Sequence, residues 1–250
     1  GLVSGLPFHW DKLDSMFCWS LMMPHGYERD LLEMQYKKRW NLFACDEYAV
    51  YSNKAIELGR GLRTSVVDSD LNCTSGGEFG TSLNTEIFIK VWKKVIADGR
   101  YKYNDWTIKV DPDCVFFAER LRVALAFHPD TYNGLYLNNC KFGMHGPIEV
   151  FSTKAVDAWG AGMEHCMTHF NELCSGSCLW GEDMFIDQCL LKVLKVHRDD
   201  DWNLLSEPHC ASDDWKECSN HRVAFHPFKN ASVYAECVKK AEFGALPMMM

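Results

Sequence analysis

Apolar and polar positions in the first third of the chain alternate between strand-like and helix-like spacing. A largely apolar run at residues 17–22 predicts a buried strand, and apolar positions spaced among charges over residues 28–39 predict a short amphipathic helix. Further strands are predicted at residues 42–45, 49–52 and 63–67. Strand, helix and strand in succession are typical of α/β proteins.

The clearest helical pattern covers residues 84–98, where apolar positions recur on one face. Asn84 is suited to cap the N-terminus of this helix, and Gly99 is suited to end it. The helix leads into an apolar, β-prone run at residues 106–110, which predicts a central strand.

Strand-like and helix-like patterns continue to alternate to the end of the chain, without an internal repeat or a long linker. Helices are predicted at residues 119–126 and 153–170 and from Trp180 onward. Strands are predicted at residues 135–137, 148–151 and 223–228.

Composition narrows the class of protein. With 250 residues, 47% of them hydrophobic, the chain can bury a substantial core. A net charge of -8 and a pI near 5.7 argue against nucleic acid as a partner, because phosphate-backbone binding needs clustered Lys and Arg. No apolar run reaches the roughly 18 to 20 residues that cross a bilayer, so no transmembrane segment is predicted. The chain begins at Gly1 rather than Met, which leaves room for a removed signal peptide, transit peptide, anchor or upstream domain.

Twelve cysteines, crowded toward the C-terminal half, favour disulfides and an oxidising compartment. Structural zinc is a weaker interpretation, because neither the C-x₃-C pair at Cys174 nor the looser pair Cys210 and Cys218 has partners at the usual spacing. Buried thiols are a third interpretation for three cysteines in apolar runs, Cys18, Cys45 and Cys114.

Two disulfides are predicted, Cys210 with Cys218 across a polar loop and Cys45 with Cys73. Asn72 and Asn230 satisfy the N-glycosylation pattern, which fits a secretory route. We therefore expect the lumen of the secretory pathway (Golgi or endoplasmic reticulum) or the extracellular space. An organelle such as a plastid, reached after removal of a transit peptide, is the alternative.

The predicted strand at residues 106–110 ends in Asp111-Pro112-Asp113, the most informative chemical feature of the sequence. The carboxyl end of a central strand is where open α/β sheets bind ligands. Two carboxylates one residue apart can converge there on a hard divalent ion such as Mg²⁺ or Mn²⁺. An ordinary solvated turn is the alternative.

Two more candidate features follow along the chain. Glu182 and Asp183 open a predicted helix, and His226 lies in a late strand. Each has a purely structural alternative, because acids favour a helix N-terminus and a histidine beside proline can simply pack in an edge strand.

The order of these features resembles the GT-A class of nucleotide-sugar glycosyltransferases, which carry a D-x-D metal motif, a later acidic motif and a C-terminal histidine. The runs Trp-Thr-x-Lys-Val-Asp-Pro-Asp and Trp-Gly-Glu-Asp are also similar to those of uncharacterised glycosyltransferase-like proteins of protists. The resemblance implies a GT-A-like α/β fold, with a Rossmann-type mixed sheet flanked by helices and a disulfide-bearing C-terminal part. It implies one domain over residues 1–250, with a nucleotide- and metal-binding half to about residue 125 and an acceptor half after it.

The resemblance also implies roles on the donor side. Asp113 would bind Mn²⁺ or Mg²⁺, Asp111 would share the metal or contact the ribose of a UDP-sugar, and His226 would complete the metal ligands. Asp46, after an early predicted strand, would lie near the uridine or ribose. An ordinary turn acid is the alternative for Asp46.

On the acceptor side, Glu182 or Asp183 would be the general base that deprotonates a hydroxyl, which implies inversion at the anomeric carbon. The sequence thus predicts a metal-dependent, inverting glycosyltransferase acting on a saccharide or glycoprotein acceptor. The alternative is a catalytically silent binding or scaffold module with this fold, such as a peripheral subunit docked on a membrane-bound complex. Convergence of Asp111, Asp113 and His226 on an open cleft would favour catalysis, and dispersal of the three would favour the scaffold.

Overall fold

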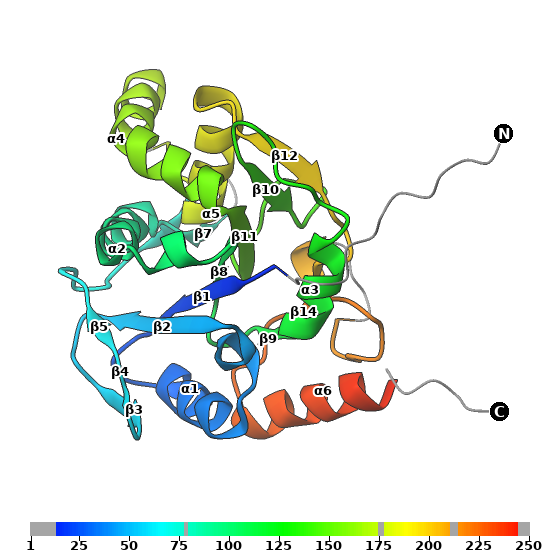
Figure 1. The fold of residues 1–250 in the computed structure, drawn as a ribbon. Helices are drawn as coiled ribbons and strands as arrows, with labels where there is room; N and C mark the ends of the chain where they lie inside the picture. The colour runs from blue at the N-terminus through cyan, green and yellow to red at the C-terminus, as the bar shows by residue number, and fades with distance from the viewer. Residues whose placement is uncertain (1–13, 78–79, 175–177, 211–214, 245–250) are drawn as a thin grey trace, which may run out of the picture.

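The computed structural model describes residues 14–77, 80–174, 178–210 and 215–244. Within these residues the largest sheet has seven strands: β1 (Met16–Leu21), β2 (Glu47–Ser52), β5 (Ser65–Val66), β8 (Trp106–Val110), β10 (Leu135–Asn138), β11 (Ile148–Ser152) and β12 (His197–Asp200). Their order in the sheet is β12-β10-β11-β8-β1-β2-β5 (Figure 1). Strand β11 is antiparallel to both neighbours, and every other neighbouring pair is parallel. The predicted mixed α/β sheet is confirmed.

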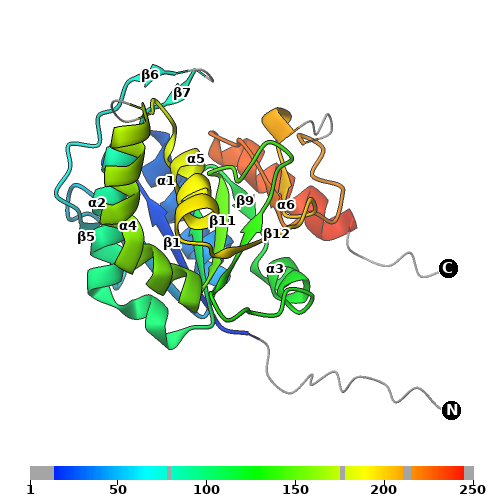
Figure 2. The same ribbon diagram turned by 90° about the horizontal axis from the view of Figure 1, so that it is seen from above.

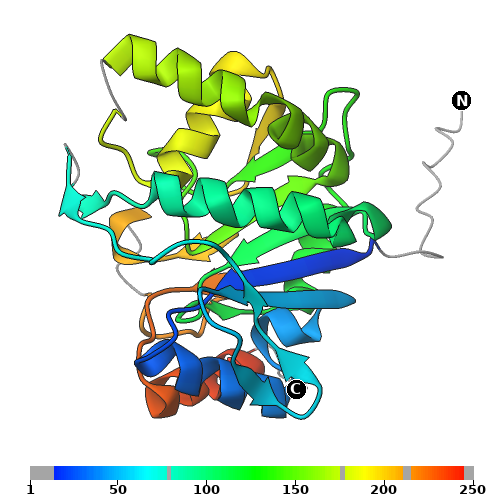
Figure 3. The same cartoon turned by 90° about the vertical axis from the view of Figure 1, so that its left-hand side faces the viewer.

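Helices cover both faces of this sheet. They are α1 (Tyr27–Lys38), α2 (Thr85–Asp98), α3 (Ala118–Leu125), α4 (Thr153–Cys174), α5 (Glu182–Gln188) and α6 (Ala231–Gly244). Seen from above, α2 and α4 lie on one side of the strands, and α3 and α6 lie on the other (Figure 2). Figure 3 shows that α2 and α4 lie side by side over the same face of the large sheet.

The alternation of side chains along the strands explains these layers, because successive residues point to opposite faces of a sheet. Trp19 of β1 packs edge-on against Trp92 of α2, with ring centroids 4.9 Å apart. On the other face, Cys18 of β1 belongs to the same apolar cluster as Leu32 of α1. Both faces of the central strands are therefore buried, as parallel strands require.

A second, three-stranded sheet carries the chain from the central sheet toward α6. Its strands are β9 (Val115–Phe116), β13 (Leu205–Ser206) and β14 (Ala224–Phe225), in the order β13-β14-β9. Strand β14 is parallel to β13 and antiparallel to β9. It thereby joins the segment just after β8 to two segments from the last quarter of the chain.

The remaining elements are short. Two hairpins pair β3 (Glu57–Gly59) with β4 (Leu62–Arg63) and β6 (Ser75–Gly76) with β7 (Thr81–Ser82). Single turns of helix are η1 (Asn41–Ala44), η2 (Arg100–Tyr103), the π-turn η3 (Cys189–Val193) and η4 (Pro208–Cys210). Among the described residues, no helix is both long and apolar enough to cross a membrane.

Two of the predicted strands are corrected. Residues 42–45 were expected to form a strand, and the segment is the 3₁₀ turn η1, with Leu42 and Phe43 buried. A short apolar run fits either structure, and here burial is achieved in a tight turn. The predicted strand at residues 63–67 is divided between the hairpin strand β4 and the sheet strand β5.

Disulfides are confirmed, but both predicted pairings are wrong. The twelve cysteines, all among the described residues, form five disulfides: Cys18–Cys45, Cys140–Cys210, Cys166–Cys189, Cys174–Cys178 and Cys218–Cys237. Cys73 is exposed and unpaired, and Cys114 is a buried thiol as expected. The partners of Cys45 and Cys210 come from segments distant in sequence, and spacing alone cannot identify such partners.

The disulfides differ in the length of chain they close, and we expect their contributions to stability to differ accordingly. The Cys140–Cys210 bond spans a sequence separation of 70, and the Cys174–Cys178 bond a separation of 4. On loop-closure entropy, replacing both cysteines by serine should lower the free energy of unfolding by about 4 kcal/mol for the first pair and about 2 kcal/mol for the second. Denaturant titration of the two double variants measures this difference. Equal losses would contradict the chain-entropy explanation.

Candidate metal centre and cleft

The D-x-D segment forms a tight turn at the carboxyl end of β8. The amide of Cys114 donates to the carbonyl of Asp111 at 3.0 Å, and Pro112 occupies the second position of the turn, where its fixed φ is favoured. Buried Gln35 of α1 donates its side-chain amide to the Pro112 carbonyl at 2.8 Å. The turn is therefore held from α1 as well as from the sheet.

The small sheet brings His226 to this turn. Strand β14 ends at Phe225, opposite Val115 of β9, so His226 lies close to the D-x-D turn that precedes β9. The amide of Phe228 donates to the carbonyl of Asp113 at 2.8 Å. These contacts place the imidazole Nε2 of His226 3.5 Å from Oδ1 of Asp113.

One ligand atom each from Asp111, Asp113 and His226 lie within 4.8 Å of one another. An octahedral ion with bonds of about 2.1 Å has ligand atoms roughly 3 to 4 Å apart, so small side-chain movements would close the site. Two carboxylates and one imidazole suit Mn²⁺ or Mg²⁺ better than softer metals. The donor set and its spacing thus fit the predicted cation.

The charges around this triad are interdependent. Burial disfavours the charged form of His226, but the hydrogen bonds that its ring donates to Asp113 and Glu207 outweigh this effect and raise its pKa to about 9. Burial also disfavours the charged form of Asp113 and on its own would raise its pKa. The nearby His226 outweighs this effect, and the pKa of Asp113 is lowered. In Asp111 burial prevails over the attraction of Lys109, and its pKa is raised. Without a cation, the proton on His226 is therefore what balances the carboxylates.

Lys109, in the strand before the turn, is 2% exposed and surrounded by acids. Its Nζ lies 3.0 Å from Asp111, 3.2 Å from Glu149 and 3.6 Å from Glu182. Glu149 stands directly opposite Lys109 in the ladder between β11 and β8. Burial would lower the pKa of Lys109, but these carboxylates raise it well above the usual value, so the lysine stays charged and occupied.

The acidic pair opens α5, as predicted, and the sequence of α2 positions it. Asn84 occupies the N-cap position of α2 as expected, yet its side chain does not cap that helix. Its Oδ1 instead accepts the backbone N–H of Glu182 at 2.9 Å. The first turn of α5 is thereby fixed against the start of α2.

Glu182 and Asp183 have different environments. Glu182 is 3% exposed, accepts a hydrogen bond from the indole of Trp92 at 3.4 Å, and has a pKa raised by burial. Asp183 is half-buried, and its Oδ2 accepts the backbone N–H of Gly146 at 3.0 Å. The second acid of the pair is therefore the more accessible one.

A cavity of about 540 Å³ joins these groups. Its volume is in the range typical of ligand-binding clefts. The lining combines acids and imidazoles with an apolar wall: Ser82, Asn84, Phe88, Lys109, Asp111, Phe142, Met144, His145, Gly146, Pro147, Gly181, Glu182, Asp183, Met184, Glu207, His209 and His226. Asp113 is not among these residues and is 6% exposed. Five of the six predicted site residues thus lie in or directly beside one cleft.

Asp46 is the predicted residue that the structure does not bring to the cleft. Its carboxylate accepts from the amide of Met16 and from Arg122, both at 2.8 Å, and the side chain is 44% exposed. Asp46 precedes β2, whereas Asp111 follows β8, and these strands run in the same direction through β1. The two acids therefore lie at opposite ends of the sheet. This placement differs from the expected one because residues 42–45 do not form the predicted strand, so Asp46 precedes strand β2 instead of following a strand.

Sequence reasoning missed Lys109 and Glu207. A lysine inside a buried, β-prone run was a usable signal for a buried charge network. Glu207 has no local signal, because its 2% exposure and its contacts arise only when β13 pairs with β14. Its two oxygens meet His145 and His226, whose hydrogen bonds overcome the effect of burial and lower its pKa to about 2.

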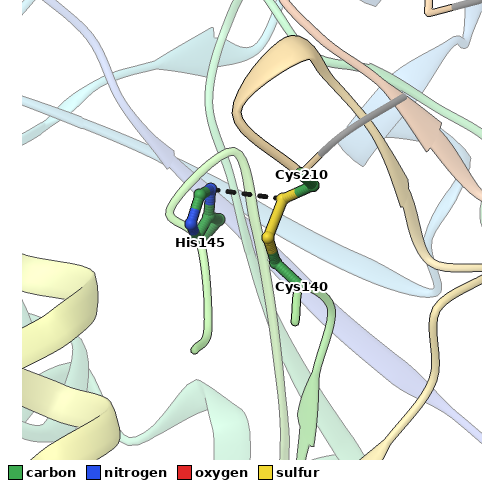
Figure 4. Close-up of side chains that lie close together, drawn as sticks. All are labelled: Cys140, His145 and Cys210. Carbon is green, nitrogen blue, oxygen red and sulfur yellow. Dashed lines mark hydrogen bonds between the residues drawn. A yellow bond between two sulfur atoms is a disulfide. The ribbon is translucent and has the colours of Figure 1, made fainter. Parts of the chain in front are cut away.

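A second group with metal-ligand chemistry lies at the same cleft. Figure 4 shows His145 beside the disulfide between Cys140 and Cys210, with Nδ1 of His145 3.3 Å from Sγ of Cys210. Thiolate is the form of cysteine that binds metals, and both sulfurs are covalently paired here. This group is therefore a structural crosslink beside the cleft.

No protein-family model matches this sequence, and no curated protein matches it. The structure is similar to that of a glycosyltransferase involved in the glycosylation of the major capsid of PBCV-1, with a TM-score of 0.45 and 8% identity over 90% of this chain and 99% of that chain. It is also similar to an active-site mutant of LgtC, with a TM-score of 0.46 and 9% identity over 78% of this chain and 76% of that one. A third similar structure is the glycosyltransferase GlyE of Streptococcus pneumoniae TIGR4, with a TM-score of 0.41 and 12% identity over 74% of this chain and 46% of that one. At these TM-scores and identities, the chemistry of this protein rests on the residues of its own cleft.

Proposed function

We propose that the protein is a metal-dependent glycosyltransferase of the GT-A class, which transfers a sugar from a nucleotide-sugar such as a UDP-sugar to a hydroxyl of a saccharide or glycoprotein. The observation that carries the proposal is the convergence of Asp111, Asp113 and His226 beside an open cleft. The cleft lies at the carboxyl end of β8, next to β1, where the strand order changes direction. Open α/β sheets bind ligands at this kind of position.

The charge of the cleft supports metal dependence. Among the described residues that line it, Lys109 is the only Lys or Arg, and its Nζ is already engaged by three carboxylates. An anionic diphosphate entering this acidic cavity needs a compensating positive charge. A divalent ion held by Asp111, Asp113 and His226 would supply Lewis-acid stabilisation of the diphosphate leaving group.

We assign the general base to Asp183 because it is the more accessible acid of the pair and lines the cleft. Glu182 is instead buried against Lys109 and Trp92. Asp183 would accept the proton of the acceptor hydroxyl while that oxygen bonds to the anomeric carbon. The bond from this carbon to the phosphate oxygen breaks, and the diphosphate leaves with the electron pair. A single displacement of this kind inverts the anomeric carbon.

The scaffold alternative has less support. Dispersed ligands or a filled cleft would favour it, whereas the described ligand atoms lie within 4.8 Å of one another and the cavity has about 540 Å³ of open volume. For the compartment, we propose the secretory lumen or the extracellular space. Five disulfides support that location, because such bonds persist where conditions are oxidising.

Thermal unfolding with Mn²⁺ and UDP tests the proposed function. A ligand that binds only the folded state and is present at 100 times its Kd stabilises that state by about 2.7 kcal/mol, which is about 5 to 10 °C in Tm for a chain of this size. We expect UDP to give this shift only with Mn²⁺ present, because Lys109, the only Lys or Arg among the described residues that line the cleft, is already paired with carboxylates. The absence of any shift with Mn²⁺, UDP or both would contradict a working donor site. A shift with UDP alone would contradict metal dependence.

A further inference from the structure

Glu207 lies between two histidines at the base of the cleft. Its Oε2 is 3.0 Å from Nδ1 of His226, and its Oε1 is hydrogen-bonded to Nδ1 of His145. The side chain is 2% exposed, so both oxygens are committed to these two rings. A buried carboxylate needs such partners, and here one partner is a candidate metal ligand.

The backbone fixes this arrangement. Ser206 of β13 pairs with Phe225 of β14, and the amide of His226 donates to the carbonyl of Ser206 at 3.1 Å. Glu207 therefore directly follows β13, and His226 directly follows β14, the strand paired in parallel with it. Their side chains are brought together by the register of the small sheet.

The other side of Glu207 is also held. Cys210, three residues later, is joined by its disulfide to Cys140, and His145 follows in the loop after Cys140 (Figure 4). The amide of His145 donates to Asn139 at 2.9 Å, and Asn139 in turn donates to the carbonyl of Ile148 at 2.6 Å. The loop carrying His145 is thus tied at several points, and Glu207 has little freedom to rotate.

We infer that Glu207 is a positioning residue that holds the ring of His226 with Nδ1 protonated and Nε2 directed at the cation. A carboxylate can only accept, so the shared proton belongs to Nδ1 of His226 and Nε2 is the nitrogen left for a metal. Nε2 is also the nitrogen that faces Asp113, at 3.5 Å. This role rests on the proposed metal site, and carboxylates behind metal-binding histidines have this effect in general.

The variant Glu207→Gln tests this role in the full chain. Glutamine keeps the shape and one acceptor oxygen but loses the charge, so we expect Mn²⁺ affinity, measured by calorimetric titration, to fall about 10- to 100-fold. Glu207→Asp keeps the charge on a shorter side chain and should retain more affinity than Glu207→Gln. In the metal-free protein, ¹⁵N NMR should show the Nδ1–H signal of His226 shifted in Glu207→Gln.

A second carboxylate–histidine arrangement provides the control. His128 lies between Asp199, at 2.7 Å from Nδ1, and Asp201, at 3.3 Å from Nε2, and none of the three lines the cleft. Asp199→Asn should leave both Mn²⁺ affinity and the His226 signal unchanged. A purely structural loss would instead lower Tm in both variants without changing Mn²⁺ affinity.

The outcomes separate this role from the proposed function. A folded Glu207→Gln variant that binds Mn²⁺ as tightly as the wild type overturns the positioning role. If Glu207→Gln does not fold, the same comparison with Glu207→Asp decides. If the wild type binds no Mn²⁺, the proposed function fails, and the His226 signal in metal-free protein still decides the positioning role, which an unchanged signal would overturn.

Discussion

Replacing Asp113 by Asn is expected to abolish the joint stabilisation by Mn²⁺ and UDP. A carboxylate oxygen of Asp113 lies within 4.8 Å of a carboxylate oxygen of Asp111 and a ring nitrogen of His226, and Asp113 is 6% exposed, so water cannot easily take its place. Loss of an outer partner of a metal ligand commonly weakens metal binding 10- to 100-fold, so loss of a ligand itself should weaken it by about 100-fold or more. Calorimetric titration of the variant with Mn²⁺, and then with UDP in the presence of Mn²⁺, measures both effects.

Asp46→Asn is the matched control, because Asp46 lies at the opposite end of the strands, against Arg122. This variant should bind Mn²⁺ and UDP like the wild type. Unchanged Mn²⁺ affinity in Asp113→Asn would mean that the D-x-D turn is not the cation site. Loss of UDP binding in Asp46→Asn would restore the nucleotide role that the sequence suggested for it.

Replacing Asp183 by Asn should reduce turnover by about 10² to 10⁴ while leaving Mn²⁺ and UDP affinity nearly intact. Asp183 belongs to α5, and its carboxylate accepts the amide of Gly146, so it is not one of the three residues of the candidate metal group Asp111, Asp113 and His226. The loss is therefore expected in the chemical step. UDP released from UDP-sugars in the presence of Mn²⁺, with water or an added saccharide as acceptor, measures turnover.

Glu182→Gln is the comparison variant, because it tests whether the other acid of the pair is the general base. Burial raises the pKa of Glu182, and its carboxyl group is held by Trp92 and Lys109, so a neutral side chain of the same shape should be tolerated far better. A larger loss in Glu182→Gln than in Asp183→Asn would reverse the assignment of the base. Full turnover in both variants would mean that neither acid is the general base, and that Glu182 and Asp183 only stabilise the N-terminus of α5.

The sequence predicted most of the scaffold because long, periodic segments determine their own structure. The helix over residues 84–98 and the strand over residues 106–110 were both found, and Gly99 ends the helix in the left-handed conformation expected of it. The short run at residues 42–45 failed because four apolar residues carry no usable period. Because this strand was predicted wrongly, Asp46 was expected at the carboxyl end of a strand, whereas it lies at the opposite end of the sheet from Asp111.

The site was predicted only as far as it is local. Asp111 and Asp113 form a motif of three residues that can be recognised in the sequence alone, and the acidic pair at the start of α5 is an equally short motif. The partners of these acids come from pairings between distant segments, as with Glu149 opposite Lys109 and Glu207 beside His226. No pattern in a single sequence specifies which distant strands pair, and the disulfide partners escaped prediction for the same reason.

The position of the small sheet in the chain has a consequence for biosynthesis. All seven strands of the central sheet end by Asp200, whereas Glu207 and His226 lie beyond it. A nascent chain can therefore complete its main sheet before His226 meets Asp111 and Asp113, and closing the long loop between Asp113 and His226 is a late event. A cation held by Asp111, Asp113 and His226 would then join a preformed scaffold and would not template it. Chelation should leave the apoprotein folded, unlike small domains whose fold depends on a bound metal.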